Sequence, residues 1–114
     1  MIAPLITYDD FRKVDIRVGR VVKVEDFAEA RNPSFKLWID FGPEIGVKRS
    51  GGQFPKEHSK EEIMGQLVIA VVNFPPKKIA NFESEVLTLG LPGSNGGWVI
   101  VSPVKEVKIG ERLA

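Results

Sequence analysis

The sequence predicts a small all-β domain with one or two short helices. Apolar and polar residues alternate with a period of two in the first half of the chain, which is typical of strands with one buried face. The 11 glycines and 8 prolines fall between apolar runs rather than inside them, as in a chain of short strands joined by turns. Because 114 residues is the length of one domain, we expect a single domain over residues 1–114.

The first expected strand runs from Val14 to Val24, where even positions are mostly apolar and odd positions mostly polar. Gly19 and Arg20 interrupt this alternation, as expected where a long strand bends or bulges to turn a barrel corner. A single helical turn from Thr7 to Lys13, capped by Thr7 or Asp9, is expected before it.

The second strand shows the cleanest alternation. One face is apolar and comprises Phe35, Leu37, Ile39 and Phe41, whereas the other carries Lys36, Trp38 and Asp40. Gly42-Pro43 ends this strand, and residues Ile45 to Ser50 predict a third, shorter one.

Residues His58 to Gly65 carry the strongest helix signal. Ser59 and Glu62 have the spacing of a capping box, in which each side chain accepts from the backbone N–H of the other residue. We expect Ile63 and Met64 to dock this helix on the barrel.

The second half of the chain predicts a buried strand and a hairpin. Leu67 to Val72 is apolar without alternation, as in a strand buried on both faces. Val86 to Leu91 and Trp98 to Val101 form a pair, and Asn95-Gly96 between them is a strong turn signal because both residues tolerate positive φ. The tail from Val104 to Leu113 alternates weakly and predicts an edge strand.

Five or six short strands, a helix after the third and a bent first strand favour a five-stranded Greek-key barrel of the oligonucleotide-binding (OB) fold, with N- and C-terminal extensions. An SH3-like barrel is the alternative on pattern alone, but it would not normally carry the inserted helix.

Composition argues against catalysis and against metal or cofactor binding. The chain has no cysteine and one histidine, His58, which we interpret as a solvated residue beside a helix cap. The N-terminus resembles no signal peptide, and the longest apolar run, Leu67 to Val72, is far shorter than the ~20 residues that span a bilayer. We therefore expect a cytoplasmic protein that is not an enzyme, needs no cofactor and does not insert into membranes.

The basic residues are candidates for a nucleic-acid interface. The net charge is only +1, so a nucleic-acid partner requires the cations to gather on one face. Six basic residues lie on predicted strands or loops rather than in one run: Arg17, Lys36, Lys48, Arg49, Lys77 and Lys78. The alternation turns Arg17 and Lys36 outward, although on charge alone we favour a solvated basic surface without a ligand.

Two other features are informative. Pro75 and Pro76 stiffen the loop that follows the buried strand, so Lys77 and Lys78 have defined positions and lose less entropy on binding. Trp38, on the outward face of the second strand, is either a base-stacking platform or a packing contact with a loop or second subunit, and we favour packing.

Three motifs carry a family resemblance: Asp15-Ile16-Arg17-Val18-Gly19, Lys36-Leu37-Trp38-Ile39-Asp40-Phe41-Gly42, and Val72-Asn73-Phe74-Pro75-Pro76-Lys77-Lys78-Ile79 leading to Ser84-Glu85-Val86-Leu87. Together they resemble the tRNA-binding domain family, and within it the CsaA subfamily, over residues 11–110. The resemblance implies an OB-fold barrel, a homodimer and binding of tRNA or tRNA-like RNA. It also implies a second activity, as an export-related chaperone that holds unfolded or pre-secretory polypeptides.

The resemblance also implies site residues. RNA contact is expected from Arg17, Lys36, Lys48, Arg49, Ser50, Asn73, Lys77, Lys78 and Ser84. Asn73 and Ser84 have a structural alternative as loop-orienting residues, and Glu85 is expected to be structural. Peptide binding or dimer contact is expected from Trp38, Phe54, Phe74 and Phe82, each of which is alternatively a core residue.

The chain departs from the CsaA pattern at three places. Arg49-Ser50-Gly51-Gly52-Gln53 replaces Gln-Ser-Ser-Ala-Gln and adds a cation, which favours RNA binding. Asn81 replaces a glycine and is expected to accept left-handed backbone. Glu83 replaces a common lysine and weakens the positive charge of the loop.

Overall fold

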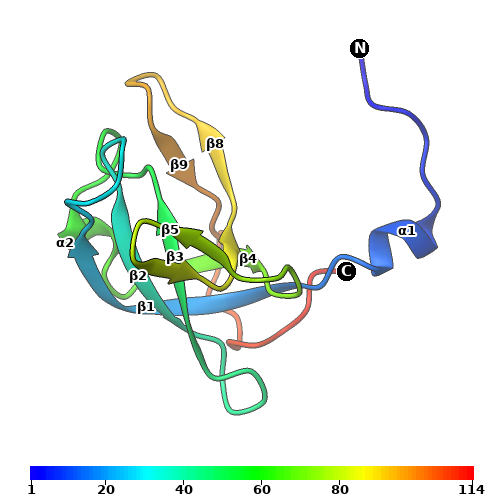
Figure 1. The fold of residues 1–114 in the computed structure, drawn as a ribbon. Coiled ribbons are helices and arrows are strands. Elements are labelled where there is room, and N and C mark those ends of the chain that lie inside the picture. Colours follow the sequence, from blue (N-terminus) through cyan, green and yellow to red (C-terminus); the bar gives the residue numbers. More distant parts are fainter.

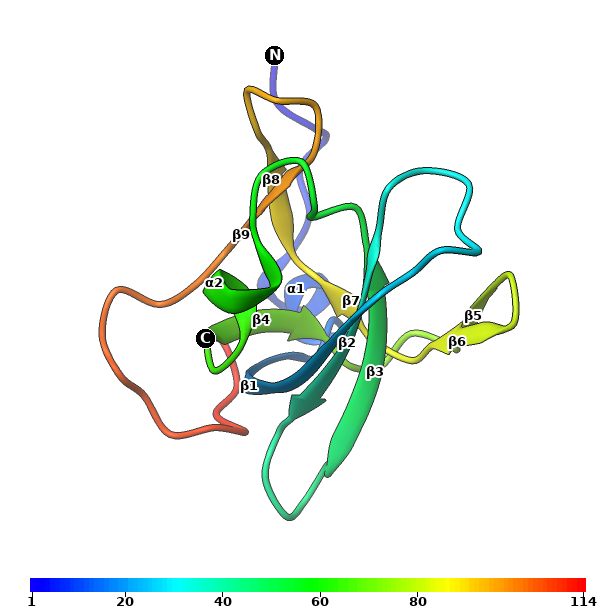
Figure 2. The ribbon, with the colours of Figure 1, turned by 90° about the vertical axis from the view of Figure 1, so that its left-hand side faces the viewer.

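Five antiparallel strands form a nearly closed barrel in the order β3-β2-β1-β4-β7 (Figures 1 and 2). This computed structural model describes residues 1–114. The barrel strands are β1 (Ile16–Asp26), β2 (Phe35–Asp40), β3 (Val47–Gly52), β4 (Leu67–Val71) and β7 (Leu87–Thr88). The backbone N–H groups of Glu85 and Val86 both donate to the carbonyl of Arg49, which brings the segment before β7 against β3. The predicted mostly-β fold with a five-stranded, OB-like barrel is confirmed.

The alternation of β2 builds the centre of the core. Phe35, Leu37, Ile39 and Phe41 are all buried, and the residues between them are partly exposed, as predicted. Fully burying an apolar side chain of this size stabilises a fold by about 1.5–3 kcal/mol relative to leaving it in water. β2 therefore fixes which face of the sheet turns inward.

β1 bends at a bulge, but not where the sequence suggested. Residues Ile16 to Arg20 pair with β4, and the later part of the strand pairs with β2. The register shifts between Val21 and Lys23, so Val22 is the extra residue and is exposed. The prediction of a bulge at Gly19 and Arg20 is wrong. Gly19 instead permits close packing, because a Cβ there would lie 2.5 Å from Cγ2 of Ile39.

Both helices begin with the side-chain caps that the sequence indicates. α1 (Tyr8–Arg12) has Thr7 at its N-cap, and α2 (Lys60–Ile63) has Ser59, each in a capping box. α2 is shorter than predicted because the chain leaves the helix at Met64, and Gly65 follows with φ +83°. Ile63 is fully buried, whereas Met64 is exposed, so the expected docking of Met64 is wrong.

A hairpin occupies the segment that the sequence indicated only as a stiffened loop. It comprises β5 (Lys77–Ile79) and β6 (Phe82–Ser84), which pair outside the barrel sheet. The left-handed residue at its turn is Ala80, with φ +52°, rather than Asn81 as predicted. The hairpin stands beside β3, where the Gly51 N–H donates to Oγ of Ser84 at 3.0 Å.

A second hairpin, formed by β8 (Gly90–Pro92) and β9 (Trp98–Ile100), rises above the barrel in the view of Figure 1. Gly96 in its turn has φ +90°, which agrees with the predicted Asn95-Gly96 turn. The predicted strand over 86–91 is divided, because its first part, β7, pairs with β4 and its second part, β8, pairs with β9.

His58 connects α2 to this second hairpin. Its Nε2 accepts from the Ile100 N–H at 3.1 Å, and its Nδ1 lies 3.1 Å from a carboxylate oxygen of Glu62. The imidazole is largely buried, so its interpretation as a solvated residue is wrong. An Nε2 that accepts leaves the proton on Nδ1, where it is donated to Glu62.

The two extensions behave differently. The end of the C-terminal tail pairs with β1, since the Val18 N–H donates to Glu111 and the Leu113 N–H donates to Ile16. Only one bridge, between Arg17 and Arg112, has strand geometry, so the predicted edge strand over 104–113 is limited to this short pairing. Residues 1–7 instead extend away from the barrel (Figure 1). No helix is long and apolar enough to cross a bilayer.

Candidate nucleic-acid interface

Three aromatic side chains meet on the outer surface of the barrel between β2 and the β5–β6 hairpin. Phe82 packs edge-on against Phe27, with ring centroids 5.3 Å apart, and against Trp38 at 5.9 Å. We call Phe27, Trp38 and Phe82 the aromatic cluster. Phe27 and Phe82 are buried, and Trp38 is partly covered. The hairpin thus packs over Trp38, which agrees with the loop-packing interpretation of that residue.

Three cations lie over the aromatic cluster. Lys36 Nζ is 5.0 Å from the ring centroid of Phe27, Lys23 Nζ is 4.5 Å from that of Trp38, and the Arg49 guanidinium is 5.7 Å from that of Phe82. Each also has an acidic partner: Lys23 pairs with Glu25 at 3.1 Å, and Lys36 lies 3.9 Å from Glu29.

Arg49 has the most extensive acidic surroundings. Its Nε donates to Glu85 at 3.2 Å, and its guanidinium lies 3.9 Å from Glu83. Burial pushes the pKa of Glu85 upward, but the backbone N–H and guanidinium of Arg49 outweigh this effect and leave the pKa below its ordinary value. Two departures from the CsaA pattern, Arg49 and Glu83, are therefore adjacent in the fold, and the added carboxylate offsets the added cation.

Ser50 and Ser84 lie in the seam that closes the barrel. Ser50 is fully buried and donates to the Val86 carbonyl at 3.1 Å while accepting from Thr88 at 2.8 Å. Ser84 accepts from the Gly51 N–H and donates to Val86. The structure supplies an internal partner for both hydroxyl groups.

Asn73 and Arg17 also have internal partners. Asn73 accepts from the Asp15 N–H at 2.9 Å and donates to the Lys13 carbonyl at 2.8 Å, which matches its loop-orienting alternative. Arg17 donates to Asp15 at 2.6 Å and to the Gly110 carbonyl at 3.0 Å. The hydrogen bond from Arg17 holds the pKa of Asp15 below its ordinary value. Arg17 thus holds the C-terminal tail, and Asn73 holds the loop before the β5–β6 hairpin.

The remaining predicted cations make no ion pair. Lys77 and Lys78 are exposed on β5, and Lys48 is half-buried on β3. None of the three lies within 4.0 Å of a carboxylate, unlike Arg17, Lys36 and Arg49.

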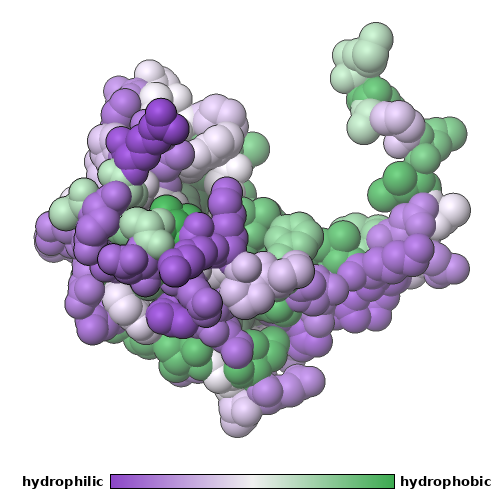
Figure 3. All heavy atoms as spheres, in the orientation of Figure 1, coloured by the Kyte–Doolittle hydropathy of each residue, from purple (hydrophilic) through white to green (hydrophobic).

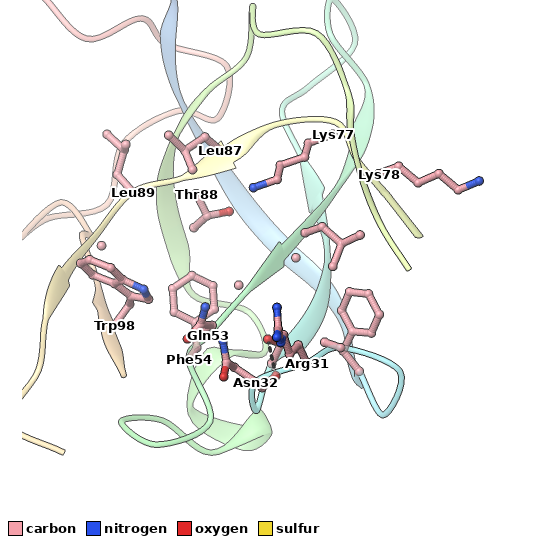
Figure 4. A pocket seen from close by; sticks show the side chains of 17 residues that line it. Arg31, Asn32, Gln53, Phe54, Lys77, Lys78, Leu87, Thr88, Leu89 and Trp98 are labelled. Atoms are coloured by element: carbon pink, nitrogen blue, oxygen red, sulfur yellow. Dashed lines mark hydrogen bonds between the residues drawn. The ribbon is translucent and has the colours of Figure 1, made fainter. Parts of the chain in front are cut away.

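A pocket of about 620 Å³ opens beside Lys77 and Lys78 (Figure 4). We call it the cationic pocket. Its walls come from the β1–β2 loop, the end of β3, β5, the 87–90 segment and β9, and its polar and aromatic lining includes Arg31, Asn32, Ser34, Gln53, Phe54, Lys77, Lys78, Thr88 and Trp98. No aspartate or glutamate lines it.

Arg31, Asn32, Gln53 and Trp98 are lining residues that sequence reasoning did not identify. A usable signal existed for the first two, because the loop after the first strand of an OB barrel helps to form its binding groove. The residues expected to bind peptide differ from one another in solvent exposure. Phe54 is buried at the base of the pocket, and only Phe74 is strongly exposed.

Hydrophilic side chains cover much of the barrel face in Figure 3, whereas the N-terminal arm is mostly hydrophobic. This contrast agrees with the exposed side chains of Ile2, Leu5 and Ile6 in the arm. No cluster of three or more histidine, cysteine, aspartate or glutamate side chains is placed to hold a metal ion.

Comparison with known families gives one consistent result. Residues 16–112 match the model of the putative tRNA binding domain. Among curated proteins, the methionine–tRNA ligase of Archaeoglobus fulgidus is 36% identical over 108 residues, covering 95% of this chain but 16% of the ligase. That of Thermococcus onnurineus is 32% identical over 109 residues, covering 95% of this chain and 14% of the ligase. The chain thus spans about a sixth of the length of these relatives or less.

Solved structures agree in fold along the whole chain. The CsaA chaperone protein of Picrophilus torridus is 47% identical, with a TM-score of 0.89, covering 96% of this chain and 100% of the other. The chaperone CsaA of Bacillus anthracis is 42% identical, also with a TM-score of 0.89, covering 97% and 100%. A MetRS-related protein of Pyrococcus horikoshii is 28% identical, with a TM-score of 0.84, covering 98% and 100%.

Proposed function

The chain belongs to the tRNA-binding domain family, and we propose that it binds tRNA or tRNA-like folded RNA as a non-catalytic module of the CsaA type. We further propose that residues 1–114 act as one domain and that the protein works in the cytoplasm, where tRNA is found. The observation that carries the RNA proposal is the pair Lys77 and Lys78, held without acidic partners on a hairpin beside the barrel.

The geometry favours interaction with the RNA backbone. Lys77 and Lys78 are exposed on a hairpin of only three-residue strands, and the preceding prolines restrict its base. A cation in a fixed position loses little entropy when it meets a phosphate. We assign the main phosphate interactions to Lys77, Lys78 and Lys48, and weaker ones to Lys36 and Arg49 because carboxylates already accompany them.

The test is a salt titration of tRNA binding by fluorescence anisotropy. For wild type we expect log Kd to rise linearly with log salt concentration. The double variant Lys77→Ala with Lys78→Ala is expected to bind about tenfold or more weakly at low salt. Its slope is expected to be smaller by about 0.7–0.9 for each phosphate that the variant no longer neutralises.

The matched control is Lys105→Ala with Lys108→Ala, which removes two other exposed lysines that make no ion pair. We expect this control to bind nearly as wild type does. Equal weakening in both variants would show that total charge, rather than the hairpin, decides binding. Absence of tRNA binding at low salt would refute the RNA proposal.

We also propose that the protein is a homodimer, because the N-terminal arm exposes Ile2, Leu5 and Ile6 on a segment that leaves the barrel. Apolar side chains gathered in this way are typical of an interaction surface. Sedimentation analysis is expected to give a dimer for wild type and a monomer for Leu5→Asp with Ile6→Asp. A wild type that stays monomeric at high protein concentration would contradict the proposal.

A second candidate function, chaperone activity toward unfolded or pre-secretory polypeptides, is favoured by the similarity to two structures described as CsaA chaperones. Exposed Phe74 offers an apolar surface for such clients. Suppression of client aggregation that persists at high salt and is weakened by Phe74→Ser would support it. No suppression by wild type would exclude it.

A further inference from the structure

The cationic pocket combines Lys77 and Lys78, which the RNA proposal uses, with Arg31 and Trp98, which it does not use. Arg31, Lys77 and Lys78 all line it, and none of them lies within 4.0 Å of a carboxylate. Elsewhere the cations Lys23, Lys36 and Arg49 each have an acidic partner. A concave site that is lined by uncompensated cations and by no acidic residue is complementary to an anion.

An aromatic wall faces these cations. Trp98 lies at one side of the opening and Lys77 at the other, with the amine of Lys77 turned toward the pocket and that of Lys78 turned away (Figure 4). Phe54 lies beside Trp98 and is almost completely buried. Gly90 allows Trp98 to approach, because a Cβ at that position would be 3.1 Å from Cβ of Trp98. A flat ring can therefore stack on Trp98 while an attached phosphate meets Lys77.

Two amide side chains complete the site. Asn32 and Gln53 line the pocket and are exposed, and neither side chain hydrogen-bonds within the protein. Free amides can both donate to and accept from the edge of a base. The volume of about 620 Å³ lies within the range of roughly 300–1,000 Å³ that is typical of small-molecule sites.

We propose that the cationic pocket receives one unpaired nucleotide of the bound RNA, with its base on Trp98 and its phosphate on Lys77 and Arg31. A base within a duplex is stacked on both faces and paired at its edge, so it cannot enter such a site without being extruded. The pocket would thus favour a folded RNA that has an unpaired end or loop over a blunt duplex. This inference rests on the proposed RNA-binding function.

The test compares two fluorescent, loop-free RNA duplexes, each made from two complementary strands, that differ only in an unpaired four-nucleotide 3′ extension on one strand. Wild type is expected to bind the extended duplex about 5- to 150-fold more tightly than the blunt one, as stacking of one base on an aromatic side chain implies. Trp98→Leu, which keeps an apolar side chain on β9, is expected to abolish this preference.

Two further variants separate the pocket from general charge. Arg31→Gln is expected to reduce the preference, whereas Lys105→Gln, which removes one exposed cation outside the pocket, is expected to leave it unchanged. Circular dichroism and thermal unfolding of each variant establish that it is folded. If Trp98→Leu is unfolded, Gln53→Ala replaces it in the test. This variant removes an amide that lines the same pocket, and it is expected to reduce the preference for the extended RNA.

The outcomes are distinguishable. If both duplexes bind wild type equally, the pocket proposal is overturned while the RNA proposal stands. If neither RNA binds, both proposals fail together. If an unstructured peptide binds instead and Trp98→Leu weakens it, the pocket belongs to polypeptide recognition, and the nucleotide assignment is wrong.

Discussion

The aromatic cluster and the cationic pocket each carry three cations, yet they use them differently. Lys23, Lys36 and Arg49 lie over aromatic rings and beside carboxylates. The three cations of the pocket have no acidic partner. The first group holds the hairpin on the barrel, whereas the second leaves its charge available to a ligand. The number of basic residues on a surface is therefore a poor guide to its binding capacity, because partners within the protein decide what remains.

The largest effect, on the free energy of unfolding, is expected from a variant that disrupts the aromatic cluster. Phe82→Ala removes the ring that packs against both Phe27 and Trp38, and it is expected to lower the free energy of unfolding by about 3–5 kcal/mol. Urea denaturation followed by circular dichroism measures this. The control Phe74→Ala, at an exposed position, is expected to change stability by about 0.5 kcal/mol or less. Equal losses of stability for both variants would mean that the cluster does not anchor the hairpin.

A smaller effect is expected when the charge of Glu83, one of the two acidic partners of Arg49, is reversed. Glu83→Lys removes a carboxylate 3.9 Å from the guanidinium and adds a cation, so tRNA affinity is expected to rise on the order of 3- to 10-fold at low salt. The increase in affinity is expected to shrink above about 0.5 M salt, where the Debye length is only a few ångströms. Anisotropy titrations measure both.

Glu61→Lys is the matched control, since it makes the same charge change on α2 at an exposed residue that has no ion pair. A similar increase in affinity for that variant would show that net charge alone sets the affinity and would remove the distinction between the two groups of cations.

The smallest effect concerns the wall of the pocket and depends on pH. Glu57 accepts from the Gly97 N–H at 3.0 Å and from the Asn95 N–H at 2.8 Å. The Gly97 bond, followed by the bonds from Asn95, holds the pKa of Glu57 below its ordinary value of 4.5 despite some desolvation. A lowered pKa means that the stabilisation is complete well above pH 4.5 and is lost as the pH falls through the folded-state pKa.

Hydrogen exchange at the Asn95 and Gly97 amides, measured by NMR between about pH 7 and about pH 3, tests this. After correction for intrinsic rates, we expect protection to fall below about pH 4.5 in wild type and to be low throughout in Glu57→Gln. Local probes are needed because Glu62 and Asp10 also have lowered pKa values and lose their cap interactions in acid. Unchanged protection over the whole range would contradict the role assigned to Glu57.

The sequence predicted the elements whose signals are local. The alternation of β2, the capping boxes at Thr7 and Ser59, and the Asn95-Gly96 turn all depend on residues a few positions apart, and all have the expected structure. The strand over 86–91 was predicted as continuous because its change of partner from β4 to β9 depends on distant segments. The same reason explains the misplaced bulge, since the register at Val22 is set by β2.

The candidate site was less predictable than the fold for a related reason. The sequence predicts RNA contacts for Lys77 and Lys78, which are available, but it predicts them for Arg17, Arg49 and Asn73 equally well. The internal partners of these last three come from other parts of the chain, such as Gly110, Glu85 and Lys13. Trp98 joins the pocket because its N–H donates to the Gln53 carbonyl, which brings β9 beside the end of β3. Sequence patterns indicate which residues are polar, but not which polar groups already have partners.

The pairing of the C-terminal tail with β1 has a consequence for synthesis on the ribosome. Arg17 and its partner Gly110 are 93 residues apart. At about 5–20 residues per second, β1 emerges roughly 5–20 s before the segment that covers its edge. During that interval the backbone of Ile16 and Val18 lacks its final hydrogen-bond partners, Leu113 and Glu111. The nascent chain therefore has an open strand edge until residues 110–113 have emerged, and crowding of neighbouring ribosomes on one message is expected to favour pairing between unfinished copies at that edge.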